Sequence, residues 1–276
     1  MKILALDSSG LVASAAVLEN GAMLAEYTMN YKKTHSQTLL PMLDEISKMI
    51  DLDLNSLDAI AVAAGPGSFT GLRIGTATAK GLGLALDKPL AAVPTVDALA
   101  MNLFDARGLV VPMMDARRQQ VYTGIYRFEN HKLTAVHEQW ASTIQELAEI
   151  LNALGEEVIL LGDGADAYRK QMEELLQVPF VFAPAHMSRQ RAGAVGVLGM
   201  QYLEEGRTVS AADFKPEYLR KSQAEREQEE KGTSMEAVEE RSEKLNPINH
   251  SEEELQGTAA EKAEAAAEGS APEESE

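Results

Sequence analysis

The first residue of the sequence that could carry out chemistry is an aspartate at the end of an apolar run. Asp7 closes the stretch KILALD and is followed by Ser8 and Ser9. An acid at the end of a buried strand can hold a cation, and the backbone of the turn after it can bind phosphate. Glycine two positions after the acid would let phosphate approach most closely, but Ser9 stands there and Gly10 follows one position later. Asp7 is therefore a weak candidate for binding a nucleotide or a metal ion.

A glycine-rich stretch, GPGSFTGLRIGTATAKGLG at residues 65–83, is the second place to look for phosphate binding. A P-loop needs Gly-Lys followed by Ser or Thr, and the stretch lacks that order. A dinucleotide-binding fold needs its glycines after the first strand and an acid at the end of the next strand. Here the glycines follow the fourth expected strand, and the next strand, PLAAV, ends at Pro94. The stretch therefore matches neither phosphate-binding motif.

The same stretch has a small residue at every fourth position of an expected helix, residues 71–86. The residues of this row are Gly71, Gly75, Ala79 and Gly83. Residues four apart lie above one another on one helix face. Glycine in a helix costs about 0.5–1 kcal/mol relative to alanine, so the close approach of another element must compensate. That element is either the protein's own sheet or another chain, and the pattern leaves both open. The sharper hypothesis is that part of this helix faces another chain, with the apolar helix Leu39 to Ile50 beside it.

Residue types that serve hydrolytic and metal enzymes are scarce in this sequence. There is no cysteine, and the five histidines lack the spacing that puts two imidazoles on one helix face. No G-x-S-x-G elbow is present, because GPGSFTG has its last glycine one position late. The sequence therefore gives no support to a metallopeptidase or a serine peptidase.

The elements that must position these residues alternate between strand and helix. An antiparallel meander of three expected strands begins at Ile3. Asn20-Gly21, between its second and third strands, is a strong hairpin signal. A helix over 36–50, a buried strand, the glycine-rich helix, another strand and a helix capped by Thr95 complete the first half. The second half begins near Gly108 with three strands and again continues with helices and strands. We expect two α/β lobes, residues 1–106 and 107–221, each with helices packed on a mixed sheet.

The charge of the chain is concentrated beyond these lobes. The net charge is −18, and residues 222–276 hold seventeen glutamates against five basic residues, with no aromatic side chain. Such a composition predicts a disordered Glu/Ala-rich tail. The remaining body is mildly acidic, and neither part looks like a surface built to hold nucleic acid unaided, because phosphate binding needs clustered Lys and Arg. No signal peptide or membrane span is visible, so we expect a cytoplasmic protein with no membrane partner.

Several stretches together resemble a known family. They are ILALDSS, HSQTLLPMLDE, LDAIAVAAGPGSFTGLRIGTATAKGLGLAL, PLAAVPTVDALA and MMDARRQQVYTGIY. They closely resemble the bacterial TsaB (YeaZ) family of tRNA threonylcarbamoyladenosine biosynthesis. The resemblance is strong from Met1 to about Phe128 and weaker as far as KPEYLR at Lys215 to Arg220. The long glycine-rich block is its most specific part, and the tail lies outside it.

The resemblance implies a two-lobed fold of the actin, Hsp70 and sugar-kinase type, which is ribonuclease H-like. It also implies a chain with no catalysis or cofactor of its own. The catalytic partner would be TsaD, which holds ATP and metal and modifies the adenosine next to the anticodon, and the ATPase TsaE would join the complex. Contact with tRNA would come only through that complex. The same helices that meet TsaD would also allow a homodimer.

The interface that the resemblance implies lies on the helices over Thr34–Ile50 and Gly71–Leu86. Its expected residues are His35, Ser36, Leu39, Leu40, Leu43, Gly71, Leu72, Arg73, Gly75, Thr76, Ala79, Lys80 and Gly83. The chain departs from the family in having His-Ser-Gln-Thr at 35–38 where His-Ser-Glu-Arg is more usual, and in its long tail. An ATP-dependent phosphotransferase or ATPase of the same superfamily is the alternative. Its second phosphate turn would have to be LLGDGAD, where an acid between Gly162 and Gly164 would repel phosphate.

Overall fold

The computed structural model describes residues 1–31 and 33–220. The predicted disorder of residues 222–276 lies outside this described part. Among the described residues, no helix is long and apolar enough to cross a membrane. The strands are β1 (Lys2–Asp7), β2 (Ala13–Glu19), β3 (Ala22–Met29), β4 (Ala59–Gly65), β5 (Leu90–Pro94), β6 (Leu109–Asp115), β7 (Gln120–Glu129), β8 (Lys132–Thr143), β9 (Val158–Leu161) and β10 (Phe180–Phe182). The α-helices are α1 (His35–Met49), α2 (Phe69–Leu86), α3 (Thr95–Met101), α4 (Ile144–Leu154), α5 (Asp163–Ala167), α6 (Arg169–Leu175) and α7 (Ala192–Glu204), and a short 3-10 turn, η1, spans Leu54–Ser56.

The first sheet has the strand order β3-β2-β1-β4-β5. The first three strands form an antiparallel meander, whereas β4 and β5 run parallel to β1. The hairpin between β2 and β3 turns at Asn20 and Gly21, which both have positive φ, as the sequence predicted. Strand β4 is buried along its whole length, because helices cover both faces of the sheet.

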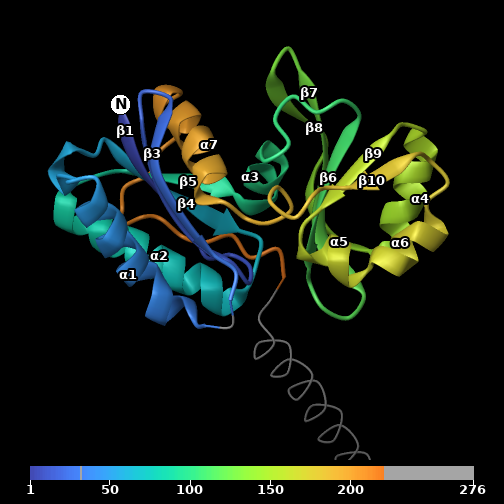
Figure 1. Cartoon of the computed structure of the whole chain (residues 1–276), viewed down its shortest axis with the longest axis horizontal. Coiled ribbons are helices and arrows are strands. Elements are labelled where there is room, and N and C mark those ends of the chain that lie inside the picture. Colours follow the sequence, from blue (N-terminus) through green and yellow to red (C-terminus); the bar gives the residue numbers. More distant parts are fainter. Residues whose placement is uncertain (32, 221–276) are drawn as a thin grey trace, which may run out of the picture. The chain divides into compact units, whose positions relative to one another are not determined.

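Helices cover the two faces of the first sheet unequally. On one face α1 and α2 pack over a core that includes Leu4, Leu6 and Val62. On the other face α7 packs over Ile3, Ala5 and the alternate residues of the same strands. Figure 1 shows α1 and α2 lying along one side of this sheet and α7 along the other. The alternation of β1 between the two cores follows from the period of two in strand side chains.

The second sheet repeats this plan with the order β10-β9-β6-β7-β8. Strands β6, β7 and β8 form an antiparallel meander, and β9 and β10 run parallel to β6. Helices α4, α5 and α6 share an apolar core on one face. Helix α3 contributes to the core on the other face, and the Tyr126 hydroxyl donates a 2.7 Å hydrogen bond to Asp97 of α3.

The two sheets therefore have the same strand order and directions, although no sequence repeat is visible. A duplicated sheet of this order, with helices on both faces, is the two-lobed actin, Hsp70 and sugar-kinase fold. The predicted fold class is confirmed.

The predicted extent of the second lobe, 107–221, is wrong at its C-terminal end. Helix α7 buries Val195, Leu198 and Tyr202 against the first sheet, so it belongs to the first lobe. After α7, Leu90 of β5 pairs with Val209, and the Glu217 N–H donates to Ala64 O. The chain thus returns to the first lobe before Arg220. The helical period of α7 gave its position in sequence but not the sheet on which it packs.

Smaller differences concern single elements. Strand β10 was not predicted, because its three residues are too few to show a period. Thr95 was predicted to cap a helix, but it is the first residue of α3 and Pro94 occupies the capping position. Gly155 ends α4 in the left-handed conformation, as expected for a helix C-terminus.

Candidate functional site

The turn after β1 is the first candidate site, and its acid is buried. One carboxylate oxygen of Asp7, Oδ1, accepts hydrogen bonds from the Ser9 N–H at 2.9 Å and the Ser9 hydroxyl at 2.6 Å. The other oxygen, Oδ2, is buried and has no hydrogen-bond partner among the described residues. Burial raises the pKa of Asp7 to about 6, and the Ser9 hydrogen bonds and the charge of His35 oppose this rise only in part.

Groups from other elements enclose this turn. His35, the first residue of α1, donates from Nε2 to Gly10 O at 2.8 Å. A Cβ at Gly10 would lie 2.7 Å from the amide nitrogen of Gln190, which is itself buried. The Asp7 turn is therefore covered by α1 on one side and by the segment before α7 on the other.

The glycine-rich loop closes the same turn from a third side. The Ser68 N–H donates to Ser9 O at 2.6 Å, and the Ser8 hydroxyl donates to Gly71 O at 2.9 Å. A Cβ added at Gly67 or Gly71 would overlap the Ser9 or Ser8 carbonyl oxygen. The glycines therefore let α2 approach the chain's own turn, and the carbonyl oxygens of Ser8 and Ser9 contact the glycine-rich loop.

The small-residue row of α2 packs on the chain's own residues, and the hypothesis that another part of this helix faces another chain stays a prediction. Gly75 lies against Ser8 and Val62, and a Cβ there would be 2.5 Å from the Ser8 hydroxyl oxygen. Gly83 lies against Leu90 and Ala211, where a Cβ would be 2.6 Å from a Leu90 methyl carbon. The row packs on the first sheet and on the segment after α7. The alternative that the pattern left open, close packing on the protein's own sheet, is the one observed.

The predicted interface residues consequently divide into two groups. Those buried in the chain's own core are Leu39, Leu43, Gly71, Leu72, Gly75, Ala79 and Gly83. The residues of this group pack within the chain's own core, and their part in an interface stays a prediction. Those that are half-buried or exposed are His35, Ser36, Leu40, Arg73, Thr76 and Lys80. For this group the interface stays a prediction. Lys80 also has an internal role, because its ammonium donates to the carbonyl oxygens of Ala212 and Phe214.

On the exposed side of α2 the sequence argument named Arg73 but missed Ala77, Gly81 and Leu84. Arg73, Ala77, Gly81 and Leu84 recur at helical spacing and are exposed. Nothing lies within 4 Å of a Cβ built at Gly81. On α1, Leu40 is exposed to 57%, and Leu84 on α2 is exposed to 62%. We call Leu40, Arg73, Ala77, Gly81 and Leu84 the outer face of α1 and α2. A second row of small residues, offset by two positions from the buried one, was the signal that could have found it.

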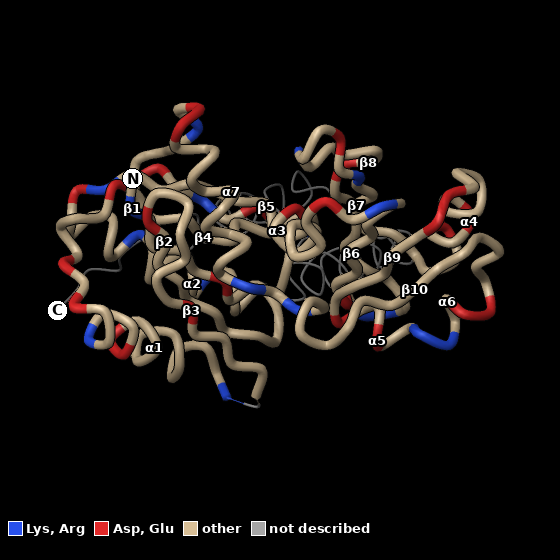
Figure 2. The backbone as a smooth tube through the Cα atoms, turned by 45° about the horizontal axis from the view of Figure 1, so that its top comes forward, with Lys and Arg blue, Asp and Glu red and all other residues tan. Residues whose placement is uncertain are grey.

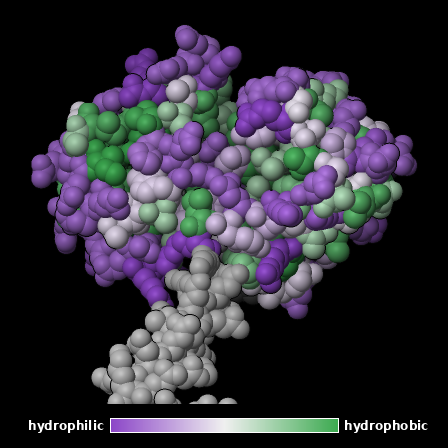
Figure 3. All heavy atoms as spheres, turned by 180° about the vertical axis from the view of Figure 1, so that it is seen from behind, coloured by the Kyte–Doolittle hydropathy of each residue, from purple (hydrophilic) through white to green (hydrophobic). Residues whose placement is uncertain are grey.

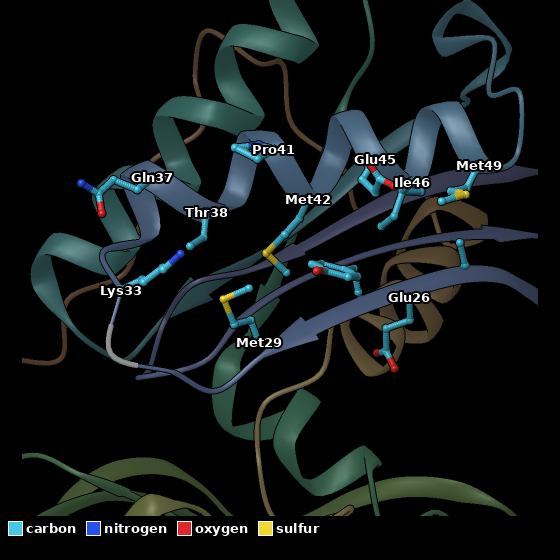
Figure 4. Close-up of a pocket in the computed structure, with 12 residues that line it drawn as sticks. Glu26, Met29, Lys33, Gln37, Thr38, Pro41, Met42, Glu45, Ile46 and Met49 are labelled. Carbon is cyan, nitrogen blue, oxygen red and sulfur yellow. The ribbon is translucent and has the colours of Figure 1, made fainter.

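A groove of about 530 Å³ lies between β3 and α1. Its apolar lining includes Met29 of β3 and Met42 and Ile46 of α1. Figure 4 shows Met29 and Met42 pointing toward one another from the two elements. The sequence analysis did not predict this groove, because the apolar residues of β3 do not alternate strictly with polar ones.

The second-lobe turn LLGDGAD is also occupied by protein. The Gly162 N–H donates to Ser188 O at 2.9 Å, and the Asp115 N–H donates to Asp163 Oδ1 at 3.2 Å. A Cβ at Gly162 would overlap the Met113 carbonyl oxygen. Burial is the main cause that raises the pKa of Asp163. Within residues 1–31 and 33–220, no three His, Asp or Glu side chains lie close enough together to hold a metal ion.

The fold and the two turns define a class of protein. It is a two-lobed protein of the actin, Hsp70 and sugar-kinase type in which both phosphate-type turns contact the chain's own groups. Comparisons narrow this class. A family model described as TsaD, tRNA N6-adenosine threonylcarbamoyltransferase, matches residues 22–228. The structure of YeaZ from Pseudomonas aeruginosa matches with a TM-score of 0.68 and 29% identity, covering 79% of this chain and 99% of that chain.

Two sequence relatives cover almost their full length. The tRNA threonylcarbamoyladenosine biosynthesis protein TsaB of Bacillus subtilis is 33% identical over 225 residues, which is 82% of this chain and 96% of the relative. The protein of the same name from Escherichia coli is 30% identical over 230 residues, which is 81% of this chain and 96% of the relative. The chain belongs to the TsaB family of tRNA threonylcarbamoyladenosine biosynthesis proteins.

The buried acid gives a prediction that does not depend on the partner. We expect Asp7→Asn to stabilise the protein at neutral pH. Because the folded state raises the pKa of Asp7 to about 6, it binds the proton more tightly than the unfolded chain does. The free energy of unfolding therefore falls as pH rises from about 4 to about 6. Each pKa unit corresponds to about 1.4 kcal/mol, so we expect a gain of roughly 2–3 kcal/mol at pH 7.

Urea unfolding followed by circular dichroism at several pH values measures this gain. Asparagine keeps an oxygen that accepts from Ser9 but has no charge, so its advantage should disappear at low pH. Asp51→Asn, at an exposed position, is the matched control and should change stability little. If Asp7→Asn made the protein less stable than wild type at neutral pH, the ionised carboxylate would have to make a favourable contact.

Proposed function

We propose that this chain is a non-catalytic subunit of tRNA threonylcarbamoyladenosine synthesis that binds and activates a TsaD-type transferase. The observation that carries the proposal is the closure of the Asp7 turn. The N–H of Ser9 is used by Asp7, and the carbonyl oxygens of Ser8 and Ser9 are in contact with the glycine-rich loop. A nucleotide phosphate needs backbone N–H groups that point at it.

The surface that we propose for the transferase is the outer face of α1 and α2. Leu40 and Leu84 provide exposed apolar area, and Ala77 and Gly81 let another helix approach closely. Close approach over small residues, flanked by apolar side chains and an arginine such as Arg73, is typical of a packed helical interface. The same face would serve a homodimer when the transferase is absent.

The remaining parts of the proposal follow from this division of roles. ATP and metal would be held by the transferase, a TsaE-type ATPase would join the complex, and the complex would work in the cytoplasm. Support comes from the family model, which carries the name of the transferase and spans most of this chain. The two proteins would then be related folds, with the nucleotide chemistry kept in one of them.

The test is to express this chain in bacterial cells whose own TsaB has been depleted. Full-length chain should restore threonylcarbamoyladenosine, measured by mass spectrometry of digested tRNA, and should co-purify with tagged transferase. The purified chain alone should show no tight magnesium-dependent binding of ATP by calorimetry. Tight ATP binding by the lone chain, with no effect on modified adenosine, would favour the phosphotransferase alternative and sink this proposal.

A further inference from the structure

Basic and aromatic side chains form a strip that is separate from the outer face of α1 and α2, except that both include Arg73. Three segments distant in sequence contribute to it, and we call it the basic–aromatic strip. Its residues are Arg73, Phe69, Tyr218, Arg220, Arg117 and Arg118. Figure 2 shows that basic and acidic residues are otherwise distributed along the whole described chain.

One end of the strip is the turn between β6 and β7, which has an unusual backbone. Arg117, Arg118 and Gln119 have φ values of 65°, 55° and 58°. The left-handed conformation brings Cβ close to the following carbonyl oxygen, so L residues other than glycine rarely adopt it in succession. Glycine would adopt it freely. Arginine at two of these positions therefore carries a backbone cost that glycine would avoid.

Neighbouring elements hold this turn in place. Asp115 Oδ1 accepts from the Arg117 N–H at 2.8 Å and from the Tyr168 hydroxyl at 3.0 Å. Arg220 donates to Ala116 O at 3.0 Å. The turn therefore presents its side chains from a fixed backbone. The side chain of Arg117 is 81% exposed although Asp115 pairs with it, and Arg118 has no ion-pair partner among the described residues.

The other end of the strip is aromatic. The Arg73 guanidinium lies 4.0 Å from the centre of the Phe69 ring, and the rings of Phe69 and Tyr218 are 4.7 Å apart. Tyr218 is 38% exposed and lies two residues before Arg220, which reaches the β6–β7 turn. The nearby acid Glu217 accepts a 3.3 Å hydrogen bond from Gln139. A partly exposed tyrosine ring is thus followed, two residues later, by a guanidinium group that reaches the β6–β7 turn.

We propose that the basic–aromatic strip contacts RNA directly, with guanidinium groups on phosphates and Tyr218 under an unpaired base. Proteins that bind single-stranded RNA combine these two features, because phosphates carry charge and bases have flat faces. An acidic protein partner would use the arginines but would have no need of the aromatic end. The mild net negative charge of the body means that attraction is local to the strip. The inference rests on the proposed function in one respect: the RNA would be the tRNA on which the complex acts.

The test is fluorescence anisotropy of full-length protein with a labelled, unmodified tRNA transcript. The double variant Arg117→Gly/Arg118→Gly removes two charges and also relieves the left-handed backbone. It should therefore raise Tm by about 2 °C while lowering tRNA affinity by about tenfold or more at low salt. The slope of log affinity against log salt should become shallower by about 1.5, as expected for two lost phosphate contacts.

Matched variants separate the strip from net charge. Arg107→Ala/Lys132→Ala removes two exposed charges near the opposite end of the β6–β7–β8 meander and should leave affinity within about twofold. Tyr218→Ala should lower affinity by about tenfold, and Tyr218→Phe should restore it, because the ring stacks without its hydroxyl.

Three outcomes would overturn the inference. The first is that the wild type shows no saturable tRNA binding at low salt. The second is that the two double variants lose equal tRNA affinity. The third is that the Arg117/Arg118 double variant keeps its tRNA affinity but no longer co-purifies with the transferase. A wild-type chain that fails to restore modified adenosine in cells would instead count against the proposed function and would leave the binding titration as a separate result.

Discussion

Gly71→Ala is expected to lower the free energy of unfolding by about 3 kcal/mol or more, although it adds a single methyl group. The new Cβ would overlap the carbonyl oxygen of Ser8, and neither the turn nor the helix can move away. Helix α2 is held at its start by Ser68, and the turn is held by Asp7 and His35. The substitution must therefore separate α2 from the first sheet.

Gly81→Ala on the same helix is the matched control. Nothing lies within 4 Å of its added Cβ, so alanine should stabilise the helix by about 0.5–1 kcal/mol. Urea unfolding of the two variants measures both effects. The same chemical change thus has opposite signs at positions ten residues apart. Two variants of equal stability would mean that α2 does not pack as described.

Gly81→Trp is expected to leave the fold intact and to weaken association with the transferase by at least about 30-fold, which corresponds to about 2 kcal/mol. The indole would project from the outer face of α1 and α2, where open space surrounds Gly81. A partner helix that approaches closely over Ala77 and Gly81 would meet the ring. The same substitution at Gly75 or Ala79, in the buried row, would unfold the protein instead.

Co-purification with tagged transferase and modified adenosine in cells measure this effect, and thermal unfolding checks the fold. Ala153→Trp on the exposed side of α4 is the control for a bulky ring on a helix surface, and it should change neither readout. If Gly81→Trp protein pairs normally, the transferase binds elsewhere, and the groove between β3 and α1 becomes the next surface to test.

Most of the fold could be predicted from the sequence, because its signals are local. Asn20-Gly21 predicted the hairpin, and the helical spacing of apolar or small residues predicted α1, α2 and α4. The packing of α7 could not be predicted in this way, since its apolar residues fit either sheet. Figure 3 shows apolar side chains broken up by polar ones on one face of the molecule. A pattern of exposed apolar residues alone therefore does not single out a partner surface.

The candidate site was harder to predict for a specific reason. A row of small residues on a helix indicates that something comes close but does not say what. In α2 both faces carry such a row, with Gly71 and Gly75 on one and Ala77 and Gly81 on the other. Ser8, which the sequence argument treated as part of a poor phosphate turn, lies against Gly71 and Gly75 of the first row.

The return of the chain to the first lobe has a consequence during synthesis. The second lobe is inserted between α3 and α7, so the first lobe is built from both ends of the body. Until residue 204 has left the ribosome, the apolar side of β1, β2 and β4 that α7 will cover stays exposed. The partly synthesised first lobe therefore keeps this apolar surface accessible to chaperones while the whole second lobe is synthesised.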